Sequence, residues 1–206
     1  MSYEKPLGHK DKKEVMNFSN PLGIILNFGM MGITSLFLAL SAAYVFSSTN
    51  WTWSQFGFPK WFVVSALMLA ASSFTLHRCL SAFRSGSKEE LNRYILLSIV
   101  ISSAFVVFQV VGWYELQSKG IYLGGRPDGS YLYLISGLHA AHVLVGMIWL
   151  FSFAMKSRKV LKNPVDSLMF FSDDRKENSL ALLNRYWHFV DILWIYLLVF
   201  FLLNHL

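Results

Sequence analysis

Five long apolar runs divide this chain, and they constrain its fold more than any other feature. Each run has at least about 20 residues, so as a helix rising 1.5 Å per residue it can cross the roughly 30 Å hydrocarbon core of a bilayer. Only 15% of the 206 residues are charged, whereas about a quarter are charged in an average soluble domain. We therefore predict an all-α integral membrane bundle of five transmembrane helices. The runs are Pro21–Phe46, Trp61–Phe83, Tyr94–Gln117, Ser130–Met155 and Tyr186–Leu206.

The sequence outside the runs is polar and mostly short. We expect residues 1–20 to form a cytoplasmic polar tail and residues 21–206 to form a single five-helix membrane domain. The first run is too long, and follows too much polar sequence, to be the apolar core of a signal peptide. The one longer connection, Lys156–Arg185, contains an apolar patch at Leu168–Phe171, which is compatible with a short helix at the inner membrane surface.

The basic residues are divided unequally between the two sides that five crossings define. Fourteen of the 18 Lys and Arg residues lie in the N-terminal tail and in the second and fourth connections, and three lie in the first and third. Because positive residues gather on the cytoplasmic side, the N-terminus is predicted to be cytoplasmic and the C-terminus periplasmic. The net charge of +6 therefore reflects membrane topology and does not indicate nucleic-acid binding.

Two histidines of the fourth run, His139 and His142, are predicted near the middle of the bilayer. Residues three apart share a helix face, and these two lie about 14 and 18 Å from the outer end. One interpretation is a metal role, as a bis-imidazole haem site or half of a di-iron site. Di-iron bundles need several inward carboxylates, and none lies at this depth. We favour the other interpretation, in which neutral imidazoles form hydrogen bonds with side chains of neighbouring helices.

A second polar group is predicted at the cytoplasmic ends of the second and fifth helices. Arg78 and Asp191 have opposite charge and both lie about 7.5 Å inside the edge of the apolar layer, so they can form an interhelical ion pair. His188 lies one turn from Asp191 on the same face. In the alternative interpretation, which the residues leave open, Arg78 reaches lipid phosphates alone and Asp191 faces a partner subunit.

Small residues predict where helices approach each other closely. The chain contains no Walker loop, no nucleophile elbow and no Rossmann glycine pattern. The residues themselves therefore predict a bundle without a reaction centre of its own. The small residues in question are Gly29, Gly32, Ala70, Ala71, Gly137, Ala140, Ala141 and Gly146.

Two stretches resemble motifs of a known family. Residues 186–194, Tyr-Trp-His-Phe-Val-Asp-Ile-Leu-Trp, resemble the last-helix signature of subunit III of the haem–copper oxygen reductases, which include cytochrome c oxidase and quinol oxidase. Residues 137–146, Gly-Leu-His-Ala-Ala-His-Val-Leu-Val-Gly, are similar to the penultimate helix of that subunit. Weaker similarities occur at 42–44 and 109–114. The order of these motifs and the number of helices resemble the short five-helix bacterial form.

The resemblance implies a non-catalytic accessory subunit of a respiratory haem–copper terminal oxidase in a bacterial plasma membrane. Such a subunit carries no haem, copper or other metal, packs beside the haem–copper catalytic subunit, holds phospholipid in a cleft, and supports proton-coupled oxygen reduction. Several polar residues would then form a structural network, and others would contact lipid head groups. The implied network is His139, His142, His188, Asp191 and Arg78, and the implied head-group contacts are Arg78, Arg185 and Trp187.

One departure from the family pattern concerns proton handling. Many relatives carry a glutamate midway along the first of these helices, and that place falls near Gly32 and Ile33 in this chain. We therefore predict that a carbodiimide specific for buried carboxyl groups does not label the first helix. Two other functions stay open from the sequence: an accessory subunit of a nitric oxide reductase, and a stand-alone haem-binding membrane protein that uses His139 and His142.

Overall fold

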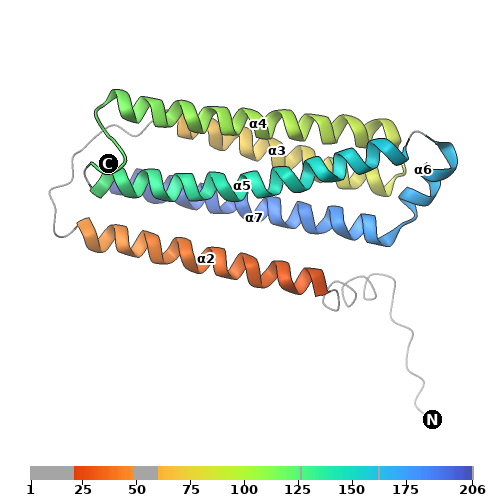
Figure 1. Cartoon of the computed structure of the whole chain (residues 1–206), viewed down its shortest axis with the longest axis horizontal. Coiled ribbons are helices and arrows are strands. Elements are labelled where there is room, and N and C mark those ends of the chain that lie inside the picture. Colours follow the sequence, from red (N-terminus) through yellow and green to blue (C-terminus); the bar gives the residue numbers. More distant parts are fainter. Residues whose placement is uncertain (1–20, 49–59, 126, 162, 206) are drawn as a thin grey trace, which may run out of the picture.

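The computed structural model describes residues 21–48, 60–125, 127–161 and 163–205, and these residues form six helices and no strand (Figure 1). Five of the helices are long and apolar enough to cross a membrane. The predicted all-α integral membrane bundle of five transmembrane helices is therefore confirmed. The N-terminal tail lies outside the described residues, and the direction of insertion stays a prediction. The helices are α2 (Pro21–Ser48), α3 (Lys60–Arg84), α4 (Lys88–Ser118), α5 (Pro127–Val160), α6 (Pro164–Phe171) and α7 (Asp174–His205).

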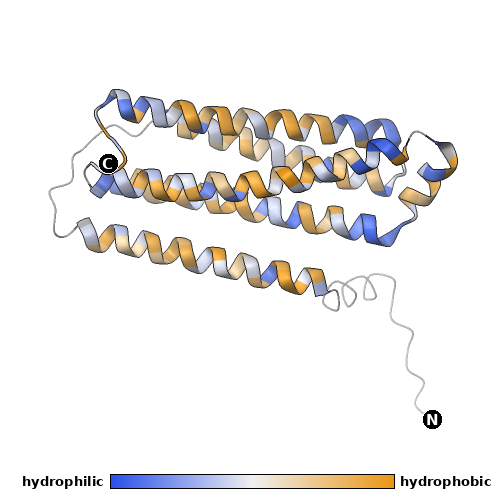
Figure 2. Ribbon diagram, in the orientation of Figure 1, coloured by the Kyte–Doolittle hydropathy of each residue, from blue (hydrophilic) through white to orange (hydrophobic). Residues whose placement is uncertain are grey.

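The helices extend beyond the apolar runs, most of all at the end of the bundle that carries α6. α5 continues past Met155 to Val160, and α7 begins at Asp174 instead of Tyr186. These extensions are rich in Lys, Arg, Glu and Leu, which favour helix in water as well as in lipid. Figure 2 shows hydrophobic residues along the middle of the long helices and hydrophilic residues at their ends. An apolar run therefore marks the part of a helix inside the bilayer, and not the whole helix.

α3 and α4 form a hairpin whose turn is closed by backbone hydrogen bonds. Gly86 has φ +70°, a left-handed conformation that glycine adopts without the steric cost of a Cβ atom. Its N–H donates to the Phe83 carbonyl oxygen at 3.1 Å, and the Ser87 N–H donates to the Ala82 carbonyl oxygen at 3.1 Å. This pairing satisfies the last carbonyl groups of α3, so α4 can start four residues after α3 ends.

α3, α4, α5 and α7 pack together as a four-helix body, and α2 lies beside this body against α5 and α7 (Figure 1). In the most apolar 18 residues of α2 only 11% of positions are buried, compared with 33–44% in the other four helices. The prediction that Gly29 and Gly32 mark a close approach is wrong, because no atom lies within 4 Å of a Cβ placed at either position. Ala70 and Ala71 are exposed as well.

The close approaches occur at two other glycines. Gly146 lies on the α5–α7 seam, where a methyl group in place of its hydrogen would lie 2.8 Å from the Trp187 ring and 3.1 Å from the Tyr186 ring. The prediction for Gly146 is therefore confirmed. Gly112 of α4 lies directly against the buried Phe62 ring of α3, a contact that the sequence analysis missed because Gly112 stands alone among large residues.

Candidate functional site: the polar core and the cleft beside α2

Buried hydroxyl groups join α3 to α4 through the middle of the four-helix body. The Ser72 and Ser102 hydroxyls share a hydrogen bond of 2.7 Å, and those of Thr75 and Ser98 share one of 2.8 Å. All four residues are buried. Hydroxyl pairs of this kind stabilise helix contacts in a bilayer, where water does not compete for them.

His139 lies in the centre of the body, enclosed by aromatic rings. Its side chain has no exposed surface, and its ring stacks on Trp194 at 4.7 Å between centroids with 22° between the planes. Phe105 meets it edge-on at 5.8 Å. Neither imidazole nitrogen has a hydrogen-bond partner among the described residues. The predicted hydrogen bond to a neighbouring helix is therefore not formed, because α4 and α7 present aromatic rings to this position.

His142 lies one turn further along α5 and faces α2. Its Nδ1 donates to the Leu138 carbonyl oxygen of its own helix at 2.7 Å, so this imidazole also does not bridge to another helix. Across the interface, the Phe37 ring of α2 meets the His142 ring at 5.7 Å between centroids. The Tyr186 hydroxyl of α7 donates to the His142 carbonyl oxygen at 2.9 Å. His142 thus marks the place where α2, α5 and α7 meet.

His188 and Asp191 lie together on α7 beside Ser73 of α3. The Ser73 hydroxyl and His188 Nδ1 share a hydrogen bond of 2.5 Å, and the His77 ring lies 6.4 Å from the His188 ring. Ser73 also lies close enough to interact with Asp191, but neither carboxylate oxygen of Asp191 has a hydrogen-bond partner in the described part of the chain. Asp191 is 7% exposed, so the bundle itself does not compensate this carboxylate.

Arg78 is the member of the implied network that the structure places apart from the others. It is exposed on α3, and its guanidinium lies over the Phe74 ring at 5.1 Å from the ring centre. The ion pair with Asp191 is not formed. Matching depth was predicted correctly, but Arg78 points outward from the bundle and Asp191 points inward. The structure therefore favours the interpretation in which Arg78 reaches lipid alone.

The two other predicted head-group contacts differ in exposure. Arg185 is exposed. Trp187 is 3% exposed and packs against Gly146, so its side chain lies inside the bundle rather than at the lipid surface. The physical reason is the small residue opposite, which leaves room for an indole ring on the α5–α7 seam. Arg78 and Arg185 therefore stay as predicted head-group contacts.

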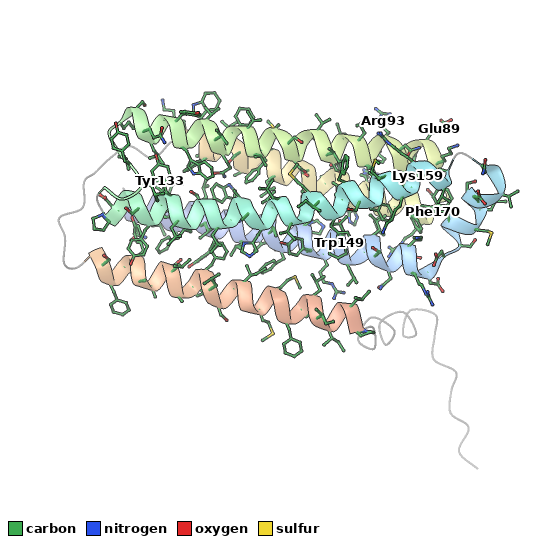
Figure 3. All side chains as sticks on the ribbon, viewed as in Figure 1. Glu89, Arg93, Tyr133, Trp149, Lys159 and Phe170 are labelled. Carbon is green, nitrogen blue, oxygen red and sulfur yellow. The ribbon has the colours of Figure 1, made fainter. Side chains whose placement is uncertain are left out.

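A cleft with a volume of about 830 Å³ opens between the start of α2 and the four-helix body. One wall is apolar and belongs to α2, and Trp149 of α5 lies in the opposite wall, on the side of the body that faces α2 (Figure 3). The rim is charged, and within it Arg84 Nε donates to Glu177 Oε1 at 2.9 Å. The lining residues that the argument uses are Leu22, Ile25, Leu26, Arg84, Trp149 and Arg175.

The sequence analysis did not single out Trp149 or Arg84. Both had a signal, because an aromatic ring and a basic residue near the cytoplasmic ends of two helices are typical of a head-group boundary. What the sequence did not contain is the distance between α2 and the body, and this distance makes the cleft.

A haem or di-iron site at the two histidines does not fit this geometry. His139 is sealed between two aromatic rings, and His142 already uses Nδ1 for its own helix. In the described part of the chain, no three His, Cys, Asp or Glu residues are grouped so that they could hold a metal ion. What the arrangement provides instead is a packed polar core and an open apolar cleft with a charged rim.

Comparison with known proteins places the chain in a family context. Residues 22–204 match the family model described as cytochrome c oxidase subunit III. The chain is 31% identical to the probable cytochrome c oxidase subunit 3 of Nocardia farcinica over 62% of its own length and 58% of that protein. It is 24% identical to the cytochrome c oxidase subunit 3 of Synechocystis, over 93% and 77% of the two chains. It is 23% identical to the quinol oxidase subunit 3 of Bacillus spizizenii, over 66% and 61%.

The matches cover less than two thirds of the Nocardia and Bacillus proteins. Even so, the family model spans nearly every described residue, from the second residue of α2 to the end of α7. Five apolar helices and bacterial relatives of this kind indicate a multi-pass protein of a bacterial membrane.

Proposed function

The chain belongs to the cytochrome c oxidase subunit III family, and we propose that it is a non-catalytic accessory subunit of a respiratory haem–copper terminal oxidase. The match over residues 22–204 is the observation that supports this most strongly. The geometry of the polar core agrees with an accessory role, since its buried groups face other helices and the aromatic rings around His139 leave no path for a diffusing substrate. In this proposal the haem and copper belong to partner subunits.

Purification from native membranes tests this assignment. A tagged chain should co-purify with a catalytic subunit that has a haem–copper spectrum and reduces oxygen. A complex that reduces nitric oxide instead would support the nitric oxide reductase alternative. A chain that purifies alone with its own Soret band, lost in His142→Ala, would support the stand-alone haem protein.

We propose further that the cleft beside α2 holds a phospholipid. Leu22, Ile25 and Leu26 offer an apolar wall for acyl chains. At the rim Arg175 can attract a phosphate group, whereas the Arg84 guanidinium is already paired with Glu177. The dimensions suit such a ligand, because the cleft volume of about 830 Å³ is in the range of sites that enclose large small molecules.

A substitution that fills the cleft tests the lipid proposal. Ile25→Trp should lower the number of phospholipids that remain with the purified complex, measured by native mass spectrometry. Ile24→Trp is the matched control, since Ile24 is also exposed on α2 but does not line the cleft. Equal lipid retention in the two variants would contradict the proposal.

We propose that Asp191 contributes to association with a neighbouring subunit. A buried carboxylate without a hydrogen bond is costly, and in this chain no described residue compensates it. Asp191→Ala should therefore reduce the amount of catalytic subunit that co-purifies, while the turnover rate of the complexes that remain is unchanged. Arg78→Ala should be tolerated, because Arg78 faces outward. A slower turnover with full association in Asp191→Ala would contradict the proposal.

A further inference from the structure

The short helix α6 has one face that is fixed to the bundle. Phe170 is 4% exposed, and its ring lies 5.5 Å from the Phe83 ring of α3 and 6.2 Å from the Phe153 ring of α5. Phe171 adds a second ring contact with Phe83 at 5.4 Å. Because Phe153 belongs to the apolar part of α5, three residues before Lys156, these contacts hold α6 at the boundary where the apolar layer ends.

The opposite face of α6 is apolar and uncovered. Val165, Leu168 and Met169 have exposed fractions of 70%, 73% and 70%. Their spacing of three and four residues places them on one side of the helix. Figure 1 shows α6 at the end of the bundle, between the end of α5 and the start of α7, so this face points away from the body.

Basic residues flank this apolar face. Between residues 156 and 176 the sequence contains six Lys and Arg residues and three Asp residues. Arg158 and Lys159 are exposed at the end of α5, and Arg175 is exposed at the start of α7. Figure 3 shows Lys159 and Phe170 at the same end of the bundle. A short helix with an exposed apolar face and basic neighbours has the chemistry of helices that lie in a membrane–water interface.

We propose that α6 is an interfacial anchor that binds anionic phospholipid. Val165, Leu168 and Met169 lie among the acyl chains next to the bundle, and the side chains of Arg158 and Lys159 contact the anionic head groups. A lipid is the occupant that fits, because α6 connects two spanning helices at the edge of the apolar layer and its surroundings carry a net positive charge. The proposal depends on the membrane fold and not on the oxidase role.

Photo-crosslinking in native membranes tests the occupant directly. A diazirine amino acid in place of Leu168 should give adducts with phospholipid, identified by mass spectrometry of the chain. The same amino acid in place of Ser172, which is exposed just beyond α6, should react mainly with water and serves as the control. Adducts of the Leu168 probe with another polypeptide, or with water alone, would overturn the proposal.

The charge contribution has its own test. Lipid adducts at position 168 should contain a larger share of anionic phospholipid than the whole membrane does, by a factor of about two or more, since each basic residue near the surface attracts anionic lipid. Arg158→Glu combined with Lys159→Glu should bring this share down to the membrane average. Arg93→Glu, an exposed basic position at the same end of the bundle but on α4 (Figure 3), should leave it unchanged. An unchanged share in the double variant would overturn the assignment of these residues.

Discussion

α2 and the four-helix body are both apolar enough to cross a membrane, but they are held in place differently. Inside the body, glycines receive aromatic rings and buried hydroxyls pair between helices. α2 has no such contact at Gly29 or Gly32, and most of its surface is exposed. In a bilayer, helix association depends on close packing and polar contacts, because lipid is as apolar as the helix surface. The body is therefore a packed unit, and α2 is an attached helix.

The weak attachment of α2 is also what creates the cleft. A helix that packed along its whole length against α5 and α7 would leave no room between Leu22 or Ile25 and Trp149. Instead α2 contacts the body mainly through two fully buried aromatic residues, Phe37 and Tyr44. Binding space and packing are thus alternatives for the same helix face.

The largest expected effect that separates the two regions is the loss of the Tyr44 side chain. Its ring lies 5.3 Å from Phe200, 6.0 Å from Phe201 and 5.9 Å from Tyr131. Tyr44→Ala should weaken α2 docking by about 3 kcal/mol, as for other aromatic truncations in a core. Hydrogen exchange should then become faster in residues 21–48 and stay the same in residues 60–118. Phe28→Ala is the control, since Phe28 is 67% exposed, and equal exchange in α2 for the two variants would show that Tyr44 is no anchor.

A methyl group at Gly146 should have the next largest effect, and on the body instead of α2. Gly146→Ala places its Cβ 2.8 Å from the Trp187 ring, and overpacking of this kind costs about 2 kcal/mol. The thermal unfolding midpoint of the purified chain should fall. Gly32→Ala, at a position with no atom within 4 Å, should leave it unchanged or raise it, because alanine favours helix over glycine. A lower midpoint for Gly32→Ala would mean that α2 is as closely packed as the body.

The hydroxyl pair between α3 and α4 should contribute less. A double-mutant cycle with Ser72→Ala and Ser102→Ala should give a coupling energy of about 0.6 kcal/mol, the average for such bonds in membrane bundles. Ser35 of α2 is the contrast, because its hydroxyl bonds the Met31 carbonyl oxygen of its own helix. Ser35→Ala combined with Ser72→Ala should show no coupling. Additive effects of Ser72→Ala and Ser102→Ala would remove the pair as a difference between the two regions.

The sequence predicted the five spans because a bilayer permits few alternatives: an apolar run of this length has to satisfy its backbone hydrogen bonds internally, as a helix. It predicted depth equally well, since depth follows from 1.5 Å per residue. Arg78 and Asp191 show the limit. Their depths match, but the direction in which each side chain points around its helix depends on which neighbour packs where, and a single sequence does not contain that.

The candidate site shows the same limit for chemistry. The sequence placed His139 and His142 on one face at mid-depth, and the structure agrees, but their surroundings come from α2, α4 and α7. Aromatic rings of Phe105 and Trp194 enclose one imidazole, and Phe37 covers the other. Gly29 and Gly32 were misjudged for the same reason. A small residue permits a close approach, and only the neighbouring helix decides whether one occurs.

The smallest expected effect concerns the ion pair at the cleft rim. Arg84 Nε and Glu177 Oε1 lie 2.9 Å apart, and the two side chains are 55% and 26% exposed. An exposed pair of this kind contributes at most about 0.5 kcal/mol, and salt screens it. Arg84→Gln should therefore change the unfolding midpoint little, and less still at high ionic strength. Glu115→Gln, which removes the comparable pair with Lys119 near the other end of the bundle, is the control for a surface pair away from the cleft. The decisive measurement is hydrogen exchange in residues 21–48. If Arg84→Gln exposed α2 as much as Tyr44→Ala does, charge at the rim and not aromatic packing would hold α2, and the open cleft would then be a consequence of the rim. Unchanged exchange keeps the distinction that packing anchors α2 at its centre while its start stays separate enough from the body to admit a ligand.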